Sequence, residues 1–355
     1  MPLLCFSRIP VLLCLYAAIV WVGNLQREKI MNTASVFRFP HFLLAIFLSL
    51  SAPPALADTY VCAGDSIGVF ADDAGLGSQP IRTITGPTAG VAECYAIAID
   101  NLHGELWVTT QSTVRVFPAR ANGDVAPLRT ITGPGLFATS IAVDVEADEV
   151  YVGTPGGGGI FVFARTGNGS PAPLRAIQGD QTTLGNVVGL FVDRVNNELY
   201  AVNYGGSVVV FARTANGNVA PLRPFITSTY PFGLVVDARA NEVFLATGTG
   251  YVRAFDRSGA ALRTIDGTSS GLTQTAGLAL RRDGILLVGN QYRSSSIPDA
   301  VFGFPRAQNG NASPVIDINF AAPLSRVSWG IATSQAYACG EGQTTSYCLF
   351  RSGFE

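Results

Sequence analysis

Short stretches in which apolar residues alternate with small or polar ones recur along the chain from residue 58 to residue 340. Between residues 188 and 226 four of them follow one another, as VGLFVD, ELYAV, SVVVFAR and APLRPFI. Alternation of this kind, with many β-branched residues and with Gly and Asn between the stretches, favours strands over helices. We therefore predict an all-β structure for this part of the chain.

This group of four stretches repeats along the chain. A Phe ends the third stretch of each copy, and successive copies lie 47, 46, 48, 44 and 49 residues apart. The six aligned residues are Phe70, Phe117, Phe163, Phe211, Phe255 and Phe304. A period of roughly 40 to 50 residues that is sustained six times is typical of a propeller or a solenoid.

The two ends of the repeat region favour a closed ring over an open solenoid. TYVCAG, at residues 59–64, matches the second strand of the unit, whereas SWGIAT, at residues 328–333, matches the first and QAYACG follows it. A last unit that is assembled from both ends closes the ring and removes the exposed edge strands. The sequence thus predicts a six-bladed β-propeller of four-stranded blades, with the last blade closed by both termini.

An Asn-Gly pair lies between the third and fourth strands of four units. This pair tolerates the positive φ that a tight hairpin turn requires, so we interpret it as such a turn. The four pairs are Asn122-Gly123, Asn168-Gly169, Asn216-Gly217 and Asn309-Gly310.

The stretch GLFVDRVNNELYAVNYGGSVVVF, at residues 189–211, resembles the NHL-type propeller repeat, as do residues 140–163 and 232–255. That pattern runs Gly, apolar, Ala, Val and Asp, then a turn, a YV strand and a strand that ends in VF. The resemblance covers most of residues 58–340, although the Asn-His-Leu tripeptide that names the family is absent. It implies the fold and leaves the activity open, because NHL-like propellers include both binding modules and enzymes.

An export leader is expected ahead of the repeats. Met31 begins a segment that contains Arg38, then the apolar run LLAIFLSLS, then PALA, whose Ala55 and Ala57 are placed as in a cleavage site. The exported chain would then begin at Asp58, and we expect it to be secreted, periplasmic or on the cell surface.

A second apolar run, at residues 10–23, is short for a membrane span, which needs about 20 residues. We interpret it as the result of a start codon assigned ahead of Met31. The alternative is a membrane anchor, if residues 1–30 are retained. The expected organisation is a leader at residues 1–57, the propeller at 58–340 and a C-terminal tail at 341–355.

The charged residues exclude several classes of function. Residues 58–355 contain 19 arginines, no lysine and 24 acidic residues, which is a formal charge of −5. A mildly acidic chain that lacks a basic cluster argues against nucleic acid as a partner. Without lysine the exported chain has no Schiff-base chemistry. His103 is its only histidine, so multi-histidine zinc sites are excluded, and we interpret His103 as an exposed turn residue.

Four cysteines lie beyond the leader, and an even number in an exported chain predicts two disulfides. The preferred pairing joins Cys62 to Cys94 and Cys339 to Cys348, which would hold down the first strand and the tail. A bond between Cys62 and Cys339, which would lock the ring directly, remains the alternative.

An Asp ends the first strand of four blades, and a Glu follows five residues later. Such a ring of carboxylates could bind cations. The favoured interpretation is structural, because an Asp at the start of a turn accepts backbone N–H groups. The pairs are Asp100 and Glu105, Asp144 and Glu149, Asp193 and Glu198, and Asp237 and Glu242.

Residues that break the repeat point to a binding surface. The loops before the first strand and after the second strand lie on one face of a propeller, because these strands are antiparallel. Aromatic and amide side chains on that face could stack on a sugar ring or hold a peptide. The candidate ligand-binding residues are Tyr95, Asn203, Tyr204, Asn290, Gln291, Tyr292 and Trp329.

The favoured function is therefore an exported, monomeric and non-catalytic binding module without a cofactor, whose partner is an unidentified ligand, glycan or protein. An alternative comes from a resemblance to lactonase-type propellers, which hold a divalent cation near the axis. Glu93, Asn203 and Asn290 would then bind Ca²⁺ or another divalent cation and activate a water molecule. The family's Asp has no counterpart on this face. A structural surface protein is the second alternative.

Overall fold

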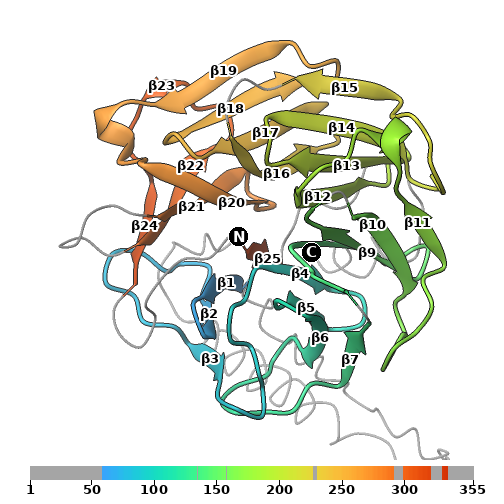
Figure 1. Ribbon diagram of the computed structural model, residues 1–355. Coiled ribbons are helices and arrows are strands. Elements are labelled where there is room, and N and C mark those ends of the chain that lie inside the picture. The colour runs from blue at the N-terminus through green and yellow to red at the C-terminus, as the bar shows by residue number, and fades with distance from the viewer. Residues whose placement is uncertain are drawn as a thin grey trace, which may run out of the picture. The chain divides into compact units, whose positions relative to one another are not determined.

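The computed structural model describes residues 58–133, 135–156, 158–226, 230–291, 299–320 and 330–334. In these ranges the strands form six sheets arranged around a central axis (Figure 1). Each sheet, or blade, contains four antiparallel strands, which follow one another from the central axis to the outer edge. One blade has a short fifth strand in addition. This is the predicted six-bladed β-propeller. The described part contains no helix long and apolar enough to cross a membrane.

The strands follow the sequence repeat, and we number the blades along the chain. Blade 1 is β4 (Ala96–Asp100), β5 (Glu105–Thr109), β6 (Thr113–Pro118) and β7 (Arg129–Thr132). Blade 2 is β8 (Ser140–Asp144), β9 (Glu149–Thr154), β10 (Gly159–Ala164) and β11 (Arg175–Ile177). Blade 3 is β12 (Val187–Asp193), β13 (Glu198–Asn203), β14 (Ser207–Ala212) and β15 (Arg223–Ile226).

Blades 4 to 6 complete the ring. Blade 4 is β16 (Pro231–Asp237), β17 (Glu242–Thr247), β18 (Tyr251–Asp256) and β19 (Ala261–Asp266). Blade 5 is β20 (Gln274–Leu280), β21 (Ile285–Gln291), β22 (Ala300–Pro305) and β24 (Ile316–Asn319). Blade 6 is β25 (Ile331–Thr333), β1 (Thr59–Ala63), β2 (Ser66–Phe70) and β3 (Arg82–Thr85). Short 3-10 turns, η1 (Asp180–Thr182) and η2 (Thr268–Ser270), lie before β12 and β20.

Blade 6 is assembled from both ends of the repeat region, as predicted. Its inner strand, β25, pairs antiparallel with β1, with Thr333 opposite Thr59. Just beyond these strands the Asp58 amide donates to Ser334 Oγ at 2.8 Å, and the Ser334 amide donates to the Asp58 carbonyl at 3.0 Å. QAYACG, which follows SWGIAT in the sequence, lies outside the described residues.

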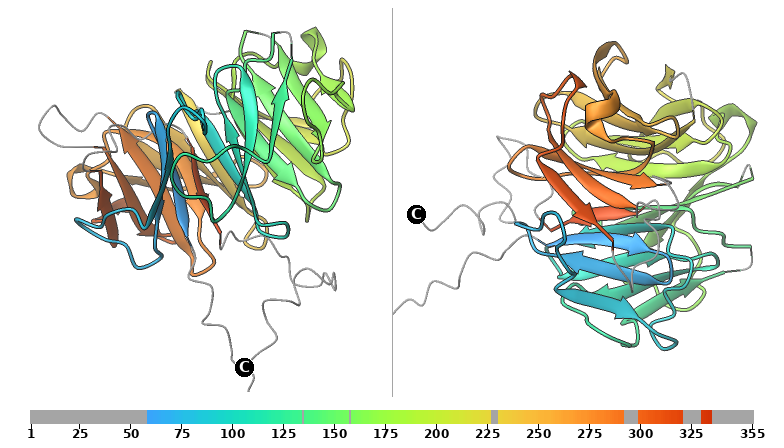
Figure 2. Two further views of the ribbon diagram at one scale, coloured as in Figure 1. Left: turned by 90° about the horizontal axis from the view of Figure 1, so that it is seen from below. Right: turned by 90° about the vertical axis from the view of Figure 1, so that its left-hand side faces the viewer.

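The antiparallel order gives the ring two faces, which the side views of Figure 2 show at the two ends of the strands. We call one of them the upper face. It carries the connections from the second to the third strand of each blade and from the fourth strand to the next blade. The lower face has the connections from first to second strand and from third to fourth strand. The candidate ligand-binding residues that the structure describes lie on the upper face: Tyr95, Asn203, Tyr204, Asn290 and Gln291.

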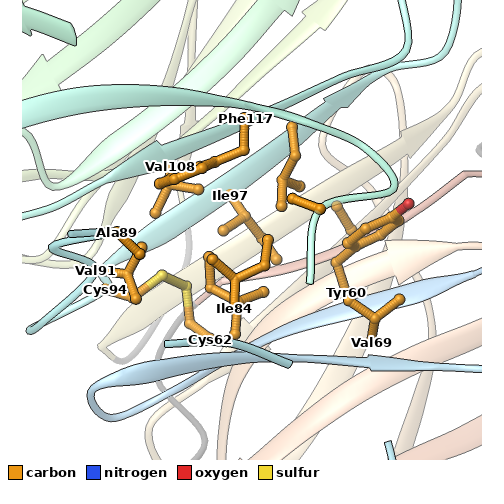
Figure 3. Packing of buried hydrophobic residues seen from close by; sticks show 14 residues of the cluster. Tyr60, Cys62, Val69, Ile84, Ala89, Val91, Cys94, Ile97, Val108 and Phe117 are labelled. Atoms are coloured by element: carbon orange, nitrogen blue, oxygen red, sulfur yellow. A yellow bond between two sulfur atoms is a disulfide. The ribbon is translucent and has the colours of Figure 1, made fainter. Parts of the chain in front are cut away.

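Apolar side chains fill the space between adjacent blades. Between blades 6 and 1, Tyr60 and Val69 pack with Ile97, Val108 and Phe117, all of them buried (Figure 3). Equivalent clusters lie between the other blades. Because these side chains come from alternate positions of strands in neighbouring blades, the period-2 pattern of the sequence is the direct signature of this core.

The glycine that opens the repeat pattern has a packing reason. Inner strands converge toward the axis, and a Cβ atom on Gly233 of β16 would lie 2.4 Å from the carbonyl oxygen of Ala276 in β20. At Gly189 of β12 the corresponding distance to the Phe232 carbonyl oxygen is 2.9 Å. Only glycine leaves room for strands this close.

The Asn-Gly pairs do not form tight hairpin turns, which corrects the prediction. The third and fourth strands are joined by longer loops, and the pair reaches across to the outer strand of the preceding blade. Asn168 Oδ1 accepts the Thr130 amide at 3.1 Å, and the Gly169 amide donates to the Thr130 carbonyl at 2.8 Å. The positive φ of the glycine was predicted correctly, at 71° for Gly169. The pairs therefore connect blades.

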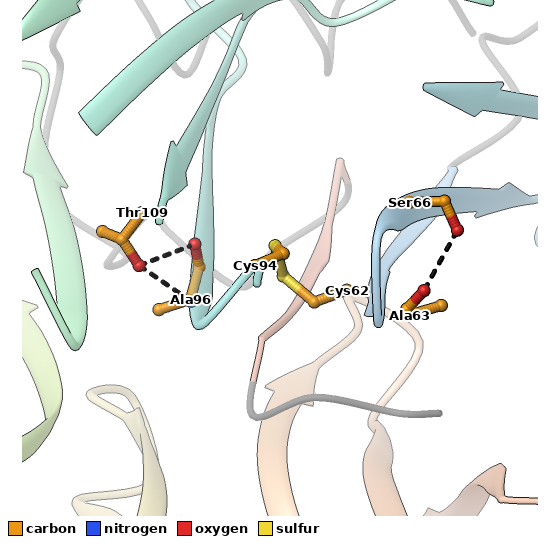
Figure 4. Close-up of a disulfide and its surroundings, with 6 residues drawn as sticks. All are labelled: Cys62, Ala63, Ser66, Cys94, Ala96 and Thr109. Atoms are coloured by element: carbon orange, nitrogen blue, oxygen red, sulfur yellow. Dashed lines mark hydrogen bonds between the residues drawn. A yellow bond between two sulfur atoms is a disulfide. The ribbon is translucent and has the colours of Figure 1, made fainter. Parts of the chain in front are cut away.

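A disulfide joins Cys62 of β1 to Cys94, which precedes β4, with their Cα atoms 5.6 Å apart (Figure 4). It connects blade 6 to blade 1, which confirms the first bond of the preferred pairing and rules out the bond between Cys62 and Cys339. Cys339 and Cys348 lie outside the described residues.

Candidate functional site

The carboxylates at the lower ends of the inner strands act in turns. Asp100 Oδ1 accepts the amides of Leu102 and His103, each at 2.9 Å, and the other three aspartates of the repeat accept amides in the same way. Asp100 Oδ2 lies 2.7 Å from His103 Nδ1, so the histidine belongs to this turn. The structural interpretation of the Asp positions is confirmed.

Each repeated glutamate binds an arginine on the outer strand of its own blade, a partner that the sequence analysis missed. Arg129 Nη1 and Nη2 donate to the two oxygens of Glu105, both at 2.8 Å. The same two-point contact joins Arg175 to Glu149, Arg223 to Glu198 and Arg263 to Glu242. In blade 6, Asp58 and Arg82 form the equivalent pair at 2.6 Å. The available signal was the arginine that follows each acid by 21 to 26 residues.

In blade 5 two apolar side chains take the place of this ion pair. Ile285 begins β21 where other blades have glutamate, and Ile316 begins β24 where they have arginine. Both are partly buried against the same core cluster. The two positions have therefore changed together, which is expected when two side chains touch and a lone buried charge would be costly.

A second set of arginines crosses the boundary between blades. Arg165, which follows β10, donates to Glu105 of the preceding blade at 3.0 Å, and Arg213 donates to Asp144 at 2.6 Å. Arg257 binds Glu198, and Arg306 binds Asp237. Between blades 5 and 6 the polarity is exchanged, because Arg281 occupies the Asp position and contacts Asp72 at 3.3 Å.

Glu198 is the most heavily bound of these carboxylates. It accepts hydrogen bonds from Arg223, Arg257 and the Tyr200 hydroxyl, the last at 3.0 Å. Burial alone would raise its pKa, but the guanidinium groups outweigh burial and lower the pKa to about 2. The four repeated glutamates are thus occupied by arginines, and a cation would have to displace them.

The two candidate asparagines on the upper face are buried, and both their oxygen and their nitrogen atoms make hydrogen bonds. Asn203 Oδ1 accepts the Gly185 amide at 2.9 Å, while its Nδ2 donates to the Thr183 carbonyl and to Ser207 Oγ. Asn290 Oδ1 accepts the Thr273 amide at 2.8 Å. Each asparagine ties the end of the second strand to the loop that leads into the first, as Thr109 does with Ala96 (Figure 4).

Among the described residues, few side chains are available to bind the cation of the hydrolase alternative. Glu93 is exposed, with φ of 56°, and lies beside Cys94. In the part of the chain with assigned positions, no three His, Cys, Asp or Glu side chains gather closely enough to hold a metal ion. Asn203 and Asn290 would have to give up backbone hydrogen bonds in order to bind one.

Exposed aromatic rings form the accessible part of the upper face. Tyr204 follows β13 and is 40% exposed, and its ring lies 5.8 Å from that of Tyr230, which is 56% exposed. Phe232, at the start of β16, lies behind them, 5.5 Å from Tyr204. This aromatic cluster, Tyr204, Tyr230 and Phe232, spans the boundary between blades 3 and 4.

A second aromatic contact lies at the boundary between blades 1 and 2. The rings of Tyr95 and Phe137 are 5.8 Å apart, and both side chains are half-buried. Burial, with a smaller effect of Glu93, raises the pKa of Tyr95, so its hydroxyl stays neutral. Tyr230, Phe232 and Phe137 were missed because their contacts with Tyr204 and Tyr95 cross a boundary between blades, which local sequence patterns do not show. Gln291 is buried, and Tyr292 and Trp329 lie outside the described residues.

Charge is distributed unequally between the two faces. The described upper-face connections contain no arginine or lysine, and their charged residues are Asp65, Glu93, Asp180 and Asp299. The arginines of the ion pairs all lie at lower strand ends or in lower-face connections. The described upper-face loops therefore present tyrosines, hydroxyls and backbone groups, while Arg115 of β6 lies beside Gly90 of one loop and Arg253 of β18 lies over the Tyr251 ring.

Solved structures with a similar fold support this architecture. The chain is similar to the crystal structure of the WD40 β-propeller domain of Doa1, with a TM-score of 0.53 and 14% identity over 77% of this chain and 82% of that one. It is also similar to a protein of unknown function from Bacteroides caccae, with a TM-score of 0.61 and 14% identity over 79% and 99%. The shared property is the fold. It is a β-propeller.

No protein-family model and no curated protein matches the chain. The NHL-type assignment of this propeller therefore stays a prediction.

Proposed function

We propose that this protein is an exported binding propeller without catalytic activity, and that its upper face binds an uncharged ligand, a neutral glycan in the first place. The observation that carries this proposal is the aromatic cluster. Tyr204 and Tyr230 expose their rings side by side on a face whose described loops lack arginine and lysine. Flat apolar rings with a hydroxyl at the edge suit the apolar face of a sugar.

The arrangement of the cluster supports a binding role over a purely structural one. Phe232 is buried and supports the ring of Tyr204, so the exposed ring is held in place by its neighbour. Less side-chain freedom is then lost when a ligand is stacked on it. The rigid blades below provide a fixed platform for the loops that carry the rings.

The binding test uses the purified exported protein and a panel of neutral hexasaccharides built from glucose, galactose or N-acetylglucosamine. We expect one of them to bind in calorimetry, and expect Tyr204→Ala and Tyr230→Ala each to weaken binding by about tenfold, about 1 to 2 kcal/mol of stacking energy. Leu76→Ala, an exposed position of a lower-face loop, is the matched control. Binding that is unchanged in both tyrosine variants would contradict the proposal.

The metal-dependent hydrolase has a weaker basis, because Asn203 and Asn290 already bond their own loops. We expect the same thermal unfolding curve in EDTA and in calcium. A cation bound only by the folded state at 100 times its Kd would add roughly 2.7 kcal/mol to the free energy of unfolding. A calcium-dependent rise in Tm would move the assignment to the hydrolase, and lactones would then be tested.

Export itself is tested at the N-terminus. Mass spectrometry of the exported protein is expected to find Asp58 as the first residue. A chain that still begins at Met1 would favour the membrane anchor.

A further inference from the structure

The four Asn-Gly pairs combine a reactive sequence with a bonded structure. Asparagine is thermolabile in proteins, since the amide nitrogen of the next residue can attack its side-chain carbonyl carbon. A following glycine hinders this attack least, because it places no side chain beside its amide nitrogen. All four asparagines of these pairs are exposed to water: Asn122, Asn168, Asn216 and Asn309.

The reaction needs a free glycine N–H and a free asparagine side chain. The glycine nitrogen gives up its proton and forms a bond to Cγ, while the Cγ–Nδ2 bond breaks and ammonia leaves with that proton. The cyclic imide then takes up a water molecule. Opening of the ring at Cγ gives aspartate, and opening at the main-chain carbonyl gives isoaspartate, which lengthens the backbone by a methylene group.

Both reacting groups are bound to the outer strand of the preceding blade. Asn122 Oδ1 accepts the Thr83 amide at 3.1 Å, and the Gly123 amide donates to the Thr83 carbonyl at 2.7 Å. The pair of blade 2 makes the same two contacts with Thr130. The amide proton that the reaction removes is thus bound to a carbonyl oxygen, while a different group holds the side chain.

The other two pairs are bound in the same way. Asn216 Oδ1 accepts the Ala176 amide at 3.3 Å, and the Gly217 amide donates to the Ala176 carbonyl at 2.7 Å. In blade 5, Asn309 Oδ1 accepts the Thr264 amide at 3.1 Å, and the glycine that follows pairs in parallel with β19. These contacts cross four boundaries, those between blades 6 and 1, 1 and 2, 2 and 3, and 4 and 5. Both groups of a pair become free when its boundary opens.

We propose that the Asn-Gly pairs are deamidation sites that react when a blade boundary opens and are protected while it is closed. Folded proteins open locally at a lower free energy than global unfolding requires, so one boundary opens without the others. An isoaspartate that forms during such an opening lengthens the backbone between Asn and Gly, and the parallel contact with the outer strand no longer fits. The modification therefore records an opening and weakens the boundary at which it occurred.

The test follows the four pairs by peptide mapping of the purified protein during incubation in mildly alkaline buffer, without and with urea. In the folded protein each pair is expected to deamidate at least about tenfold more slowly than in urea, because only open molecules react. The disulfide of Cys62 and Cys94 crosses the same boundary as Asn122. Cys62→Ala/Cys94→Ala is therefore expected to speed the reaction of Asn122 more than that of Asn309.

Two substitutions of the partner residue Thr130 separate the contact of Asn168 from overall stability. Thr130→Pro removes the amide that Asn168 accepts, and an outer edge strand tolerates proline. We expect Asn168 to react about three- to tenfold faster in the folded variant, because one hydrogen bond is lost. Its rate in urea should stay unchanged, since the sequence around Asn168 is unaltered. Thr130→Ser, which keeps the amide, is the matched control and should behave like the wild type.

Thermal melts verify that both Thr130 variants are folded, and three outcomes would overturn the proposal. Equal rates in the folded and the urea-unfolded protein would show that the contacts give no protection. An unchanged rate of Asn168 in folded Thr130→Pro would place the protection elsewhere. Equal acceleration of all four pairs in that variant would assign the reaction to global unfolding rather than to a single boundary.

Discussion

Glu198 shows how a single residue joins two blades. It comes from β13, and its carboxylate holds Arg223 of its own blade and Arg257 of the next one. Both partners are guanidinium groups, which remain charged at every pH at which the protein folds. The protonation state of the Glu198 carboxyl group therefore decides whether its ion pairs with Arg223 and Arg257 exist.

The repeated glutamates predict a loss of stability in acid. The pKa of Glu198 is lowered to about 2 from 4.5, and those of Glu105, Glu149 and Glu242 are also lowered. A carboxylate whose folded pKa is depressed stabilises the protein above its unfolded pKa, and that contribution is lost as pH falls through the folded pKa. The Tm is expected to be nearly constant down to about pH 5 and to fall steeply between pH 4.5 and 2.

Glu198→Gln provides the specific check on this profile. At pH 7 it is expected to cost about 3 kcal/mol of unfolding free energy, since two guanidinium groups lose their counter-charge. Its Tm should also fall less between pH 4.5 and 2 than that of the wild type. Glu146→Gln, which removes a more exposed pair with Arg194, is the control and should cost less than about 1 kcal/mol. Parallel acid profiles of wild type and Glu198→Gln would refute this assignment.

At the scale of the blade, strands were predictable and the contacts between blades were not. Alternation and the Phe spacing located the strands, because these patterns are local. The Asn-Gly pairs were assigned to hairpins by the same local logic. Their real partners, such as Thr130 for Asn168, lie 38 residues away in the preceding blade. The Glu–Arg pairs are likewise long-range, and only comparison between repeats could have revealed them.

The exchanged polarity between blades 5 and 6 gives a prediction at this scale. Arg281→Asp alone would face Asp72, and Asp72→Arg alone would face Arg281, so each single variant is expected to lower stability by about 2 to 4 kcal/mol. The double variant restores the polarity of the other boundaries and should recover at least about 1 kcal/mol of the summed loss. Urea unfolding of all four proteins measures the coupling. Additive losses would mean that the two side chains do not interact.

Closure of the ring was predictable, whereas the binding surface was predictable only in part. Incomplete units at the two ends of the repeat region implied a shared blade, and β25 beside β1 confirms it. Of the candidate site residues, Tyr204 is exposed and Asn203 and Asn290 are buried in structural contacts. Sequence patterns identify residues that leave the repeat, but they do not show whether the polar atoms of those residues already have partners.

The disulfide predicts how strongly the contact between blades 6 and 1 depends on a covalent bond. Cys62→Ala/Cys94→Ala is expected to lower the free energy of unfolding by about 3 kcal/mol, because the bond closes a segment of 32 residues in the unfolded chain. Wild-type protein in reducing agent should approach the urea midpoint of this variant. An unchanged midpoint in the variant would mean that packing alone holds blades 6 and 1 together.

The shared blade also has a consequence for the order in which the chain is made. Asp58 and Ser334, which bond at the closure, are 276 residues apart. Strands β1 to β3 leave the ribosome first and wait for β25, the last described strand to be synthesised, with an unpaired edge open to wrong partners. A nascent chain therefore cannot complete its ring until almost all of it has been translated. A chain that terminates anywhere before β25 would keep two unpaired strand edges. Such fragments are natural substrates for chaperones and proteases.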